Sequence, residues 1–183
     1  MKTQIRSGVF ETNSSSIHSI AIKRKSYEEG LESFKKWLSD PVLVFDLGEF
    51  GWAAKKYTTP ASRASYLWTM ACSDTIKEAT RRKSYIESVL KEVGVSCRFQ
   101  KVTAKKYEDG YECCVAEDDS WFGIDHSDEW QAFKELVFRD KDLLLDFLFG
   151  DSYILTYNDN DDYDYWLYSV DDGVKRDTWT KGN

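Results

Sequence analysis

The sequence has no apolar run long enough to cross a bilayer. Its longest apolar segment, residues 143–149, is interrupted by Asp146, whereas a membrane-spanning helix needs about 20 predominantly apolar residues. The first residues, MKTQIRSG, are polar and charged, unlike the apolar core of a secretory signal peptide. We therefore expect no membrane contact and a location in the cytoplasm of the cell that makes the protein.

Proline and glycine are also scarce, with two prolines and ten glycines in 183 residues. This leaves little room for a long linker between domains. Hydrophobic residues make up 42% and aromatic residues 15% of the chain, a composition that excludes an intrinsically disordered protein. We expect a single domain that spans residues 1–183 and buries a sizeable core.

The four cysteines lack the CxxC spacing that is typical of zinc sites and of redox motifs. Two of them, Cys113 and Cys114, are neighbours, and neighbouring side chains on a strand point to opposite faces. We interpret Cys72, Cys97, Cys113 and Cys114 as reduced thiols, as expected in the cytoplasm.

Charge is distributed unevenly along the chain, although the overall net charge is only −7. Residues 1–100 have a net charge of +5 and residues 101–183 a net charge of −12. The first part therefore suits contact with nucleic acid, and the second suits a basic groove on a protein.

Hydrophobic periodicity predicts helices and short strands in no strict alternation. Helices are predicted at residues 27–38, 60–72, 74–93, 128–138 and 141–149, the third capped by Ser73 or Asp74. Strands are predicted at residues 16–22, 42–47, 95–102, 111–116, 152–157 and 163–170. The strands at 95–102 and 111–116 are expected to form a hairpin around Asp109-Gly110. This mixture favours an α+β fold, with a mostly antiparallel mixed sheet packed against several helices.

A polar stretch near the start, GVFETNSSSIHS at residues 8–19, is the first candidate site. Its candidate catalytic residues are Glu11, Asn13, Ser14, Ser15, Ser16 and His18. Histidine is the usual general acid or base near neutral pH, and hydroxyl and amide groups can hold a phosphate or an oxyanion. Glu11 can orient His18 or carry a second proton. The alternative is a polar turn whose serine side chains bond the backbone.

The second candidate is GIDHS at residues 123–127, which contains the only other histidine, His126, next to Asp125. If His18 and His126 converge, one can act as base and the other as acid in metal-free RNA cleavage. The alternative is structural, because Ser127 or Asp128 can cap the helix that follows.

An acidic segment, NDNDD at residues 158–162 with Asp164, is the third candidate. Its oxygen ligands can hold a divalent metal such as Mg²⁺ or Ca²⁺, although the EF-hand pattern fails and the sequence requires no cofactor. Without metal, the segment can imitate a phosphate backbone or form a solvated turn.

Basic residues interleaved with the aromatic residues Tyr57, Tyr66 and Trp68 form the fourth candidate. Phosphate contacts and base stacking of this kind hold single-stranded RNA, while solvated helix faces are the alternative. The candidate RNA-binding residues are Lys23, Arg24, Lys25, Arg81, Arg82 and Lys83, the last three on an exposed arc of their helix.

Several of these segments resemble a family of phage and mobile-element proteins. They are GVFETNSSSIHS, GEFGW (residues 48–52) with ASYLWT (64–69), GIDHS, and the Asn/Asp turn near the end. Some members are similar to anti-CRISPR inhibitors of the type II-A system of Firmicutes. The resemblance implies a type II Cas nuclease with its guide RNA as the partner, in the cytoplasm of a bacterial host. It also implies an action that shortens the guide RNA in the presence of the nuclease.

Three functional hypotheses follow. In the first, the protein promotes guide RNA truncation, with His18 as base or acid and with Asp125 and His126 completing the site. In the second, it is a non-enzymatic inhibitor whose acidic C-terminal half blocks a groove lined by Arg and Lys. In the third, it is a phage hydrolase or regulatory protein unrelated to CRISPR.

Overall fold

The computed structural model describes residues 16–36, 40–51, 53–125, 131–158 and 173–181. Its helices are α1 Tyr27–Lys36, α2 Pro60–Ala71, α3 Ile76–Glu92, α4 Gln131–Val137 and α5 Lys141–Phe149. Its strands are β1 Ser16–Ile22, β2 Val42–Phe45, β3 Glu49–Phe50, β4 Lys55–Tyr57, β5 Ser96–Phe99, β6 Val102–Lys106, β7 Glu112–Ala116, β8 Gly123–Ile124, β9 Ser152–Asn158 and β10 Asp177–Lys181. The predicted α+β class is confirmed.

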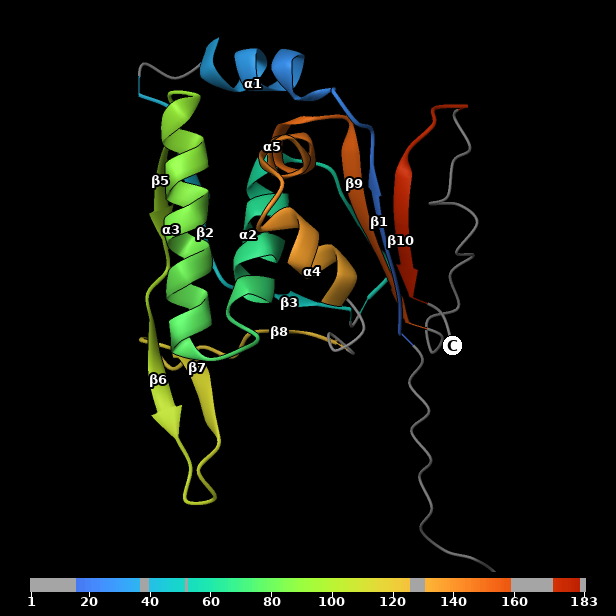
Figure 1. Ribbon diagram of the computed structural model, residues 1–183. Coiled ribbons are helices and arrows are strands. Elements are labelled where there is room, and N and C mark those ends of the chain that lie inside the picture. The colour runs from blue at the N-terminus through green and yellow to red at the C-terminus, as the bar shows by residue number, and fades with distance from the viewer. Residues whose placement is uncertain (1–15, 37–39, 52, 126–130, 159–172, 182–183) are drawn as a thin grey trace, which may run out of the picture.

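The main sheet has the strand order β10-β1-β9-β4 and is antiparallel throughout. Helix α5 packs against β9 and β1, α2 packs against α5, and α3 flanks α2 on the side away from this sheet (Figure 1). The remaining strands form three pairs, β2–β5, β3–β8 and β6–β7. Within the described segments, no helix is long and apolar enough to span a bilayer.

Helix α5 lies at the centre of the core because it is apolar on nearly all sides. Every residue from Leu143 to Phe149 is buried, the pattern expected of a helix enclosed by other elements. The ring of Phe147 packs on Phe133 of α4, and the ring of Phe149 packs on Phe34 of α1. A Cβ on Gly30 of α1 would lie 1.8 Å from the carbonyl oxygen of Phe149, so only glycine permits this helix crossing.

The one charged residue inside this apolar run, Asp146, is fully buried and holds the start of α1. Its carboxylate accepts hydrogen bonds from the backbone N–H groups of Lys25 and Ser26, each at 2.8 Å. Lys25 has a positive φ of 58°, which turns its N–H toward the helix. Asp146 therefore satisfies two part-buried backbone donors at the start of α1.

The turn from α5 into β9 is fixed by a second buried charge, Arg63 of α2. One guanidinium nitrogen donates to the carbonyl oxygens of Gly150 at 2.8 Å and Ser152 at 2.7 Å. Burial lowers the pKa of Arg63 to about 10. The Ser152 hydroxyl in turn donates to the backbone carbonyl of Asp146 at 2.8 Å.

The structure corrects the predicted pairing around residues 95–102. This segment is two strands: β5 pairs in parallel with β2, and β6 forms the hairpin with β7. Gln100 separates them, because its carbonyl accepts from the indole of Trp68 at 3.0 Å and its side-chain oxygen accepts from the N–H of Leu47 at 2.7 Å. Tertiary contacts of this kind override local strand periodicity.

Smaller predictions also need correction. GEFGW, predicted as a turn, contains β3, and α3 is capped by Thr75 rather than by Ser73 or Asp74. The C-terminal strand β10 was not predicted, and the predicted strand at 163–170 lies outside the described residues, as do residues 128–130 of the predicted fourth helix.

We expect Asp146→Ala to lower the free energy of unfolding by about 3 kcal/mol, because two part-buried N–H groups lose a charged acceptor. Asp142→Ala is the matched control, since Asp142 lies on the same helix but is exposed, and it should change stability by about 0.5 kcal/mol or less. Urea unfolding at pH 7 measures both values. Equal losses for the two variants would show that the buried carboxylate does not hold α1.

Candidate functional site

His18 lies in the middle of the four-stranded sheet and is fully buried. It sits on β1 opposite Thr156 of β9 and Lys181 of β10, with a relative exposure of 0%. Neither ring nitrogen is accessible to solvent. As predicted, the imidazole shares a strand face with Ile20 and Ile22, because alternate residues of a strand point the same way.

Gly51 brings the GEFGW segment into contact with this histidine. Its φ is +110°, and a Cβ at this position would lie 2.6 Å from Nε2 of His18 and 2.7 Å from Cβ of Asp125. The side chains of His18 and Asp125 therefore both reach the space that a Cβ on residue 51 would fill, and only glycine leaves that space open. Three segments that the sequence singled out, containing His18, Gly51 and Asp125, meet here.

The position of Asp125 is set by the short parallel pair β3–β8. The N–H of Asp125 donates to the carbonyl of Phe50 at 2.9 Å, and the N–H of Gly123 donates to the carbonyl of Gly48 at 3.0 Å. Thr69 of α2 accepts from the N–H of Gly48 at 3.0 Å and thereby ties this pair to the core. Asp125 itself is half-buried, with its Oδ2 atom enclosed.

Hydroxyl groups and aromatic rings lie on segments that adjoin the site. Thr156, which faces His18 across the sheet, donates to the carbonyl of Ala53 at 2.8 Å. Burial raises the pKa of Tyr57, and contact with Thr156 offsets this only in part. The ring of Phe50 packs edge-on against Tyr57 and Tyr66, with centroid distances of 5.2 and 4.9 Å.

The hydroxyl of Tyr66 is fully buried and has no hydrogen-bond partner among the residues that the structure describes. Its pKa is raised, first because burial disfavours the phenolate and second because Tyr57 is close. A neutral phenol can donate a hydrogen bond, so this group adds a donor to the polar interior near Phe50.

An imidazole and a carboxylate whose side chains meet at one glycine can act as a proton-transfer pair. In such a pair the carboxylate orients the ring and stabilises its protonated form. Gly51 and Thr156 were not predicted as site residues. Tyr57 and Tyr66 were expected only as aromatics that stack on RNA, which is wrong for Tyr66 because its side chain is fully buried. Only the glycine in GEFGW offered a sequence signal, because a glycine between aromatic residues permits close backbone approach.

Most of the other predicted catalytic residues cannot be placed. Outside the described residues lie Glu11, Asn13, Ser14, Ser15 and His126. The same holds for residues 159–162 and Asp164 of the acidic segment. Ser16 begins β1, where its backbone is in register with Asn158. The convergence of His18 with Asp125 is the part of the predicted site that the described residues bring together.

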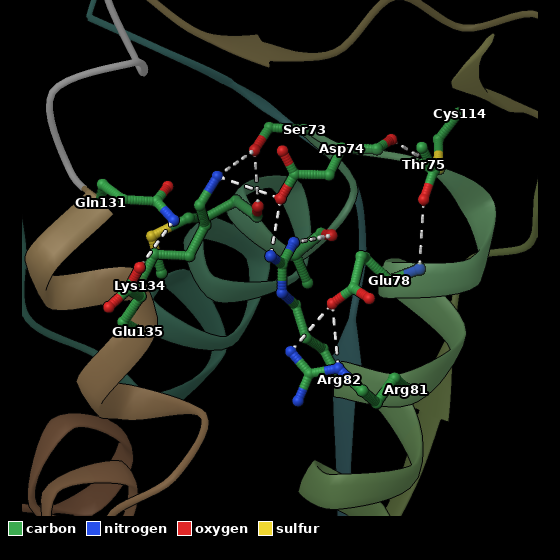
Figure 2. Close-up of polar contacts among 12 residues, drawn as sticks. Ser73, Asp74, Thr75, Glu78, Arg81, Arg82, Cys114, Gln131, Lys134 and Glu135 are labelled. Atoms are coloured by element: carbon green, nitrogen blue, oxygen red, sulfur yellow. Dashed lines mark hydrogen bonds and ion pairs between the residues drawn. The ribbon is translucent and has the colours of Figure 1, made fainter.

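Two of the predicted RNA-binding residues are committed to contacts within the protein. Arg24 donates to Asp140, the N-cap residue of α5, at 2.9 Å. Arg82 is only 6% exposed, so the expectation that it lies on an exposed arc is wrong. Its guanidinium donates to the carbonyl of Ala71 at 2.9 Å and pairs with Asp74 at 2.6 Å (Figure 2).

Asp74 joins Arg82 to a second buried cation, Lys134 of α4. The Lys134 ammonium lies 3.1 Å from Asp74 and also donates to Ser73 at 3.3 Å (Figure 2). Partial burial raises the pKa of Asp74, but the hydrogen bonds and charges of Arg82 and Lys134 outweigh it and hold that pKa below its ordinary value. This cluster connects α2, α3 and α4.

The remaining basic candidates are more accessible. Lys23, Lys25 and Arg81 are exposed and Lys83 is half-buried. Arg81 pairs with Glu78 at 2.9 Å, and Lys83 lies 3.7 Å from Glu87 on the same helix. Exposed pairs of this kind are weak, so these side chains can exchange their partners for phosphate.

No group of three or more metal-ligating side chains occurs among the described residues. All four cysteines are free thiols. Comparisons of the chain with protein-family models, curated proteins and solved structures find no match.

Alanine at Gly51 should disturb the site specifically. We expect Gly51→Ala to cost about 3 kcal/mol, from a strained positive φ and from overpacking against His18 and Asp125. Gly94→Ala is the matched control: its φ is +71°, but nothing lies within 4 Å of the added Cβ. It should cost about 1 kcal/mol. Urea unfolding compares the two variants, and equal losses would contradict the close approach at Gly51.

The cluster of Asp74, Arg82 and Lys134 should make stability depend on acid pH. A carboxyl whose pKa is lowered by folding stabilises the protein above its unfolded pKa of about 3.9, and this contribution disappears as pH falls through the folded pKa. At pH 7, we expect Asp74→Asn to cost about 2 kcal/mol. This is less than for a fully buried pair, because Asp74 is 38% exposed.

The difference between wild type and Asp74→Asn should shrink as the pH falls below about 4. Urea midpoints measured across acid pH test this, with Glu78→Gln as the control for an exposed pair. A difference that stays constant with pH would rule out the charged form of Asp74 as its source.

Proposed function

We propose that the protein inhibits a type II-A Cas nuclease–guide RNA complex by promoting truncation of the guide RNA. The observation that carries this proposal is the meeting of His18 and Asp125 at Gly51. These residues belong to the two histidine-containing segments on which the resemblance to anti-CRISPR proteins depends. An acid–base pair is the minimum that RNA cleavage without metal requires.

In this proposal, a base removes the proton from a ribose 2′-hydroxyl, whose oxygen attacks the adjacent phosphorus. An acid protonates the departing 5′-oxygen, which leaves a 2′,3′-cyclic phosphate and a 5′-hydroxyl. His18 and Asp125 supply the two proton carriers or orient a carrier that touches the RNA. The accessible cations Lys23, Lys25 and Arg81 supply sequence-independent phosphate contacts.

A second candidate function is favoured by the complete burial of His18. A histidine enclosed by a sheet can stabilise the fold without touching a substrate. The protein would then inhibit the same complex without chemistry, by placing its acidic C-terminal part in a groove that normally holds nucleic acid.

Guide RNA on a denaturing gel distinguishes these functions. The samples are RNA alone, RNA with this protein, RNA with the Cas nuclease, and all three together, each with and without EDTA. We expect a shorter guide only in the complete mixture. Its ends should be 2′,3′-cyclic phosphate and 5′-hydroxyl, and EDTA should have no effect.

We expect His18→Gln and Asp125→Asn to reduce truncation by about 100-fold or more, the usual contribution of a proton carrier. Asp177→Asn, on the exposed part of β10, is the control, and urea unfolding verifies that each variant folds. Full truncation by a folded His18→Gln variant would remove His18 from the reaction.

An intact guide with blocked DNA cleavage would support the non-enzymatic function. If guide and DNA cleavage are both unaffected, the protein acts outside CRISPR immunity, as a phage hydrolase or regulator.

A further inference from the structure

The β6–β7 hairpin and the loop after it expose three large aromatic side chains. Tyr107 is 44% exposed, Tyr111 61% and Trp121 73%. The two tyrosines flank the hairpin turn with their ring centroids 6.0 Å apart, and the hairpin extends away from the helices (Figure 1). Exposed tyrosine and tryptophan are the side chains that most often carry binding energy in protein interfaces.

Two of these aromatics, Tyr107 and Trp121, border a cavity of about 520 Å³ between the hairpin and the core. Tyr107 and Trp121 line it together with Lys105 and Asp119, and Phe122 and Ile124 contribute apolar surface. The cavity is large enough for one long side chain of a partner, and it offers both apolar walls and a carboxylate.

The charge of this region favours a cationic partner. Residues 101–122 contain three lysines and six aspartates or glutamates. Two of these charges neutralise each other, because Lys101 pairs with Glu117 at 3.3 Å. By contrast, Glu108, Glu112 and Asp119 have no ion-pair partner among the described residues, so they remain available to an incoming cation.

We propose that Tyr107, Tyr111, Trp121 and the adjoining cavity form a docking surface for an arginine-bearing segment of a basic protein. A guanidinium can stack on an aromatic face and pair with a carboxylate at the same time. Trp121 supplies a face, Tyr107 supplies another on which an arginine would replace the Lys105 ammonium, 5.3 Å from the ring centroid, and Asp119 supplies the carboxylate. RNA bases also stack on aromatics, but the excess of carboxylates repels the phosphates that would accompany them.

The same surface connects to the proposed active site. Strand β8, Gly123–Ile124, forms part of the cavity wall and leads directly into Asp125. A partner seated at Trp121 would therefore contact the segment that positions Asp125 beside His18. The identity of this partner as the Cas nuclease rests on the proposed function, whereas the chemistry of the surface does not.

Fluorescence anisotropy with three labelled probes tests the surface on the full chain. The probes are a short peptide of alternating arginine and glycine, the same peptide with lysine in place of arginine, and an oligouridine RNA. We expect the arginine peptide to bind most tightly, because lysine is a point charge that stacks poorly. Trp121→Ala and Tyr107→Ala should each weaken this binding about tenfold.

Leu136→Ala is the control, since Leu136 is an exposed apolar side chain on α4, 48% accessible, and it should leave binding unchanged. Asp119→Asn should weaken binding and reduce its salt dependence. The proposal is overturned if wild type does not bind the arginine peptide, if oligouridine binds as tightly, or if the aromatic variants bind as wild type does. It is also overturned if wild type self-associates in sedimentation experiments through these aromatics, since the occupant is then a second copy of the chain.

The guide RNA assay, repeated with Trp121→Ala, separates this inference from the proposed function. If Trp121→Ala loses peptide binding and even wild type does not truncate the guide, the docking surface is supported and the proposed function is rejected. If wild type and Trp121→Ala truncate the guide equally, the proposed function is supported and the docking surface has no part in nuclease recognition.

Discussion

The corner between α5 and β9 is the constraint on which the rest of the structure depends. Two buried charges lie beside it: Arg63 holds the carbonyls of Gly150 and Ser152, and Asp146 holds the start of α1. Buried charges are costly unless hydrogen bonds compensate them, so these contacts disfavour other arrangements of the corner. The corner therefore has one geometry, and β9 begins at one place.

That starting point determines the candidate site. Ser152 lies opposite Ile22, so the antiparallel register places Thr156 opposite His18 and Lys55 of β4. A shift of one residue would turn His18 to the other face of the sheet and away from Gly51. The meeting of His18, Gly51 and Asp125 thus depends on hydrogen bonds at the far end of β9, and residues remote from the site control its geometry.

Local sequence patterns predicted where helices and strands lie better than they predicted which strands pair and which side chains meet. Alternation predicted β1 with its observed bounds, and the apolar run predicted α5, because each pattern reflects the environment of its own segment. Pairing of β5 with β2 depends on Gln100 and Trp68, which are distant from Leu43 in sequence, so no local signal reveals it. The position of Arg82 was predicted wrongly for the same reason. Helical periodicity places a charged residue on the solvent-facing side, but the Arg82 guanidinium pairs with Asp74 and lies over the ring of Phe138. The candidate site could be predicted only in part. His18 and Asp125 were predicted from their side-chain chemistry, whereas Gly51 and Thr156 belong to the site only because the fold brings them next to His18.

The burial of His18 and the exposure of Trp121 have a common explanation under the proposed function. An enclosed acid–base pair does not cut RNA indiscriminately, because free RNA in solution cannot reach it. Only Phe122, Gly123 and Ile124 separate Trp121 from Asp125, and Ile124 is both a wall of the surface cavity and a member of the β3–β8 pair. This pair has only two residues in each strand, and short elements with few hydrogen bonds open at a low free-energy cost. In the proposed function, the partner supplies the free energy that opens the site, and the guide RNA bound to that partner is the RNA in reach.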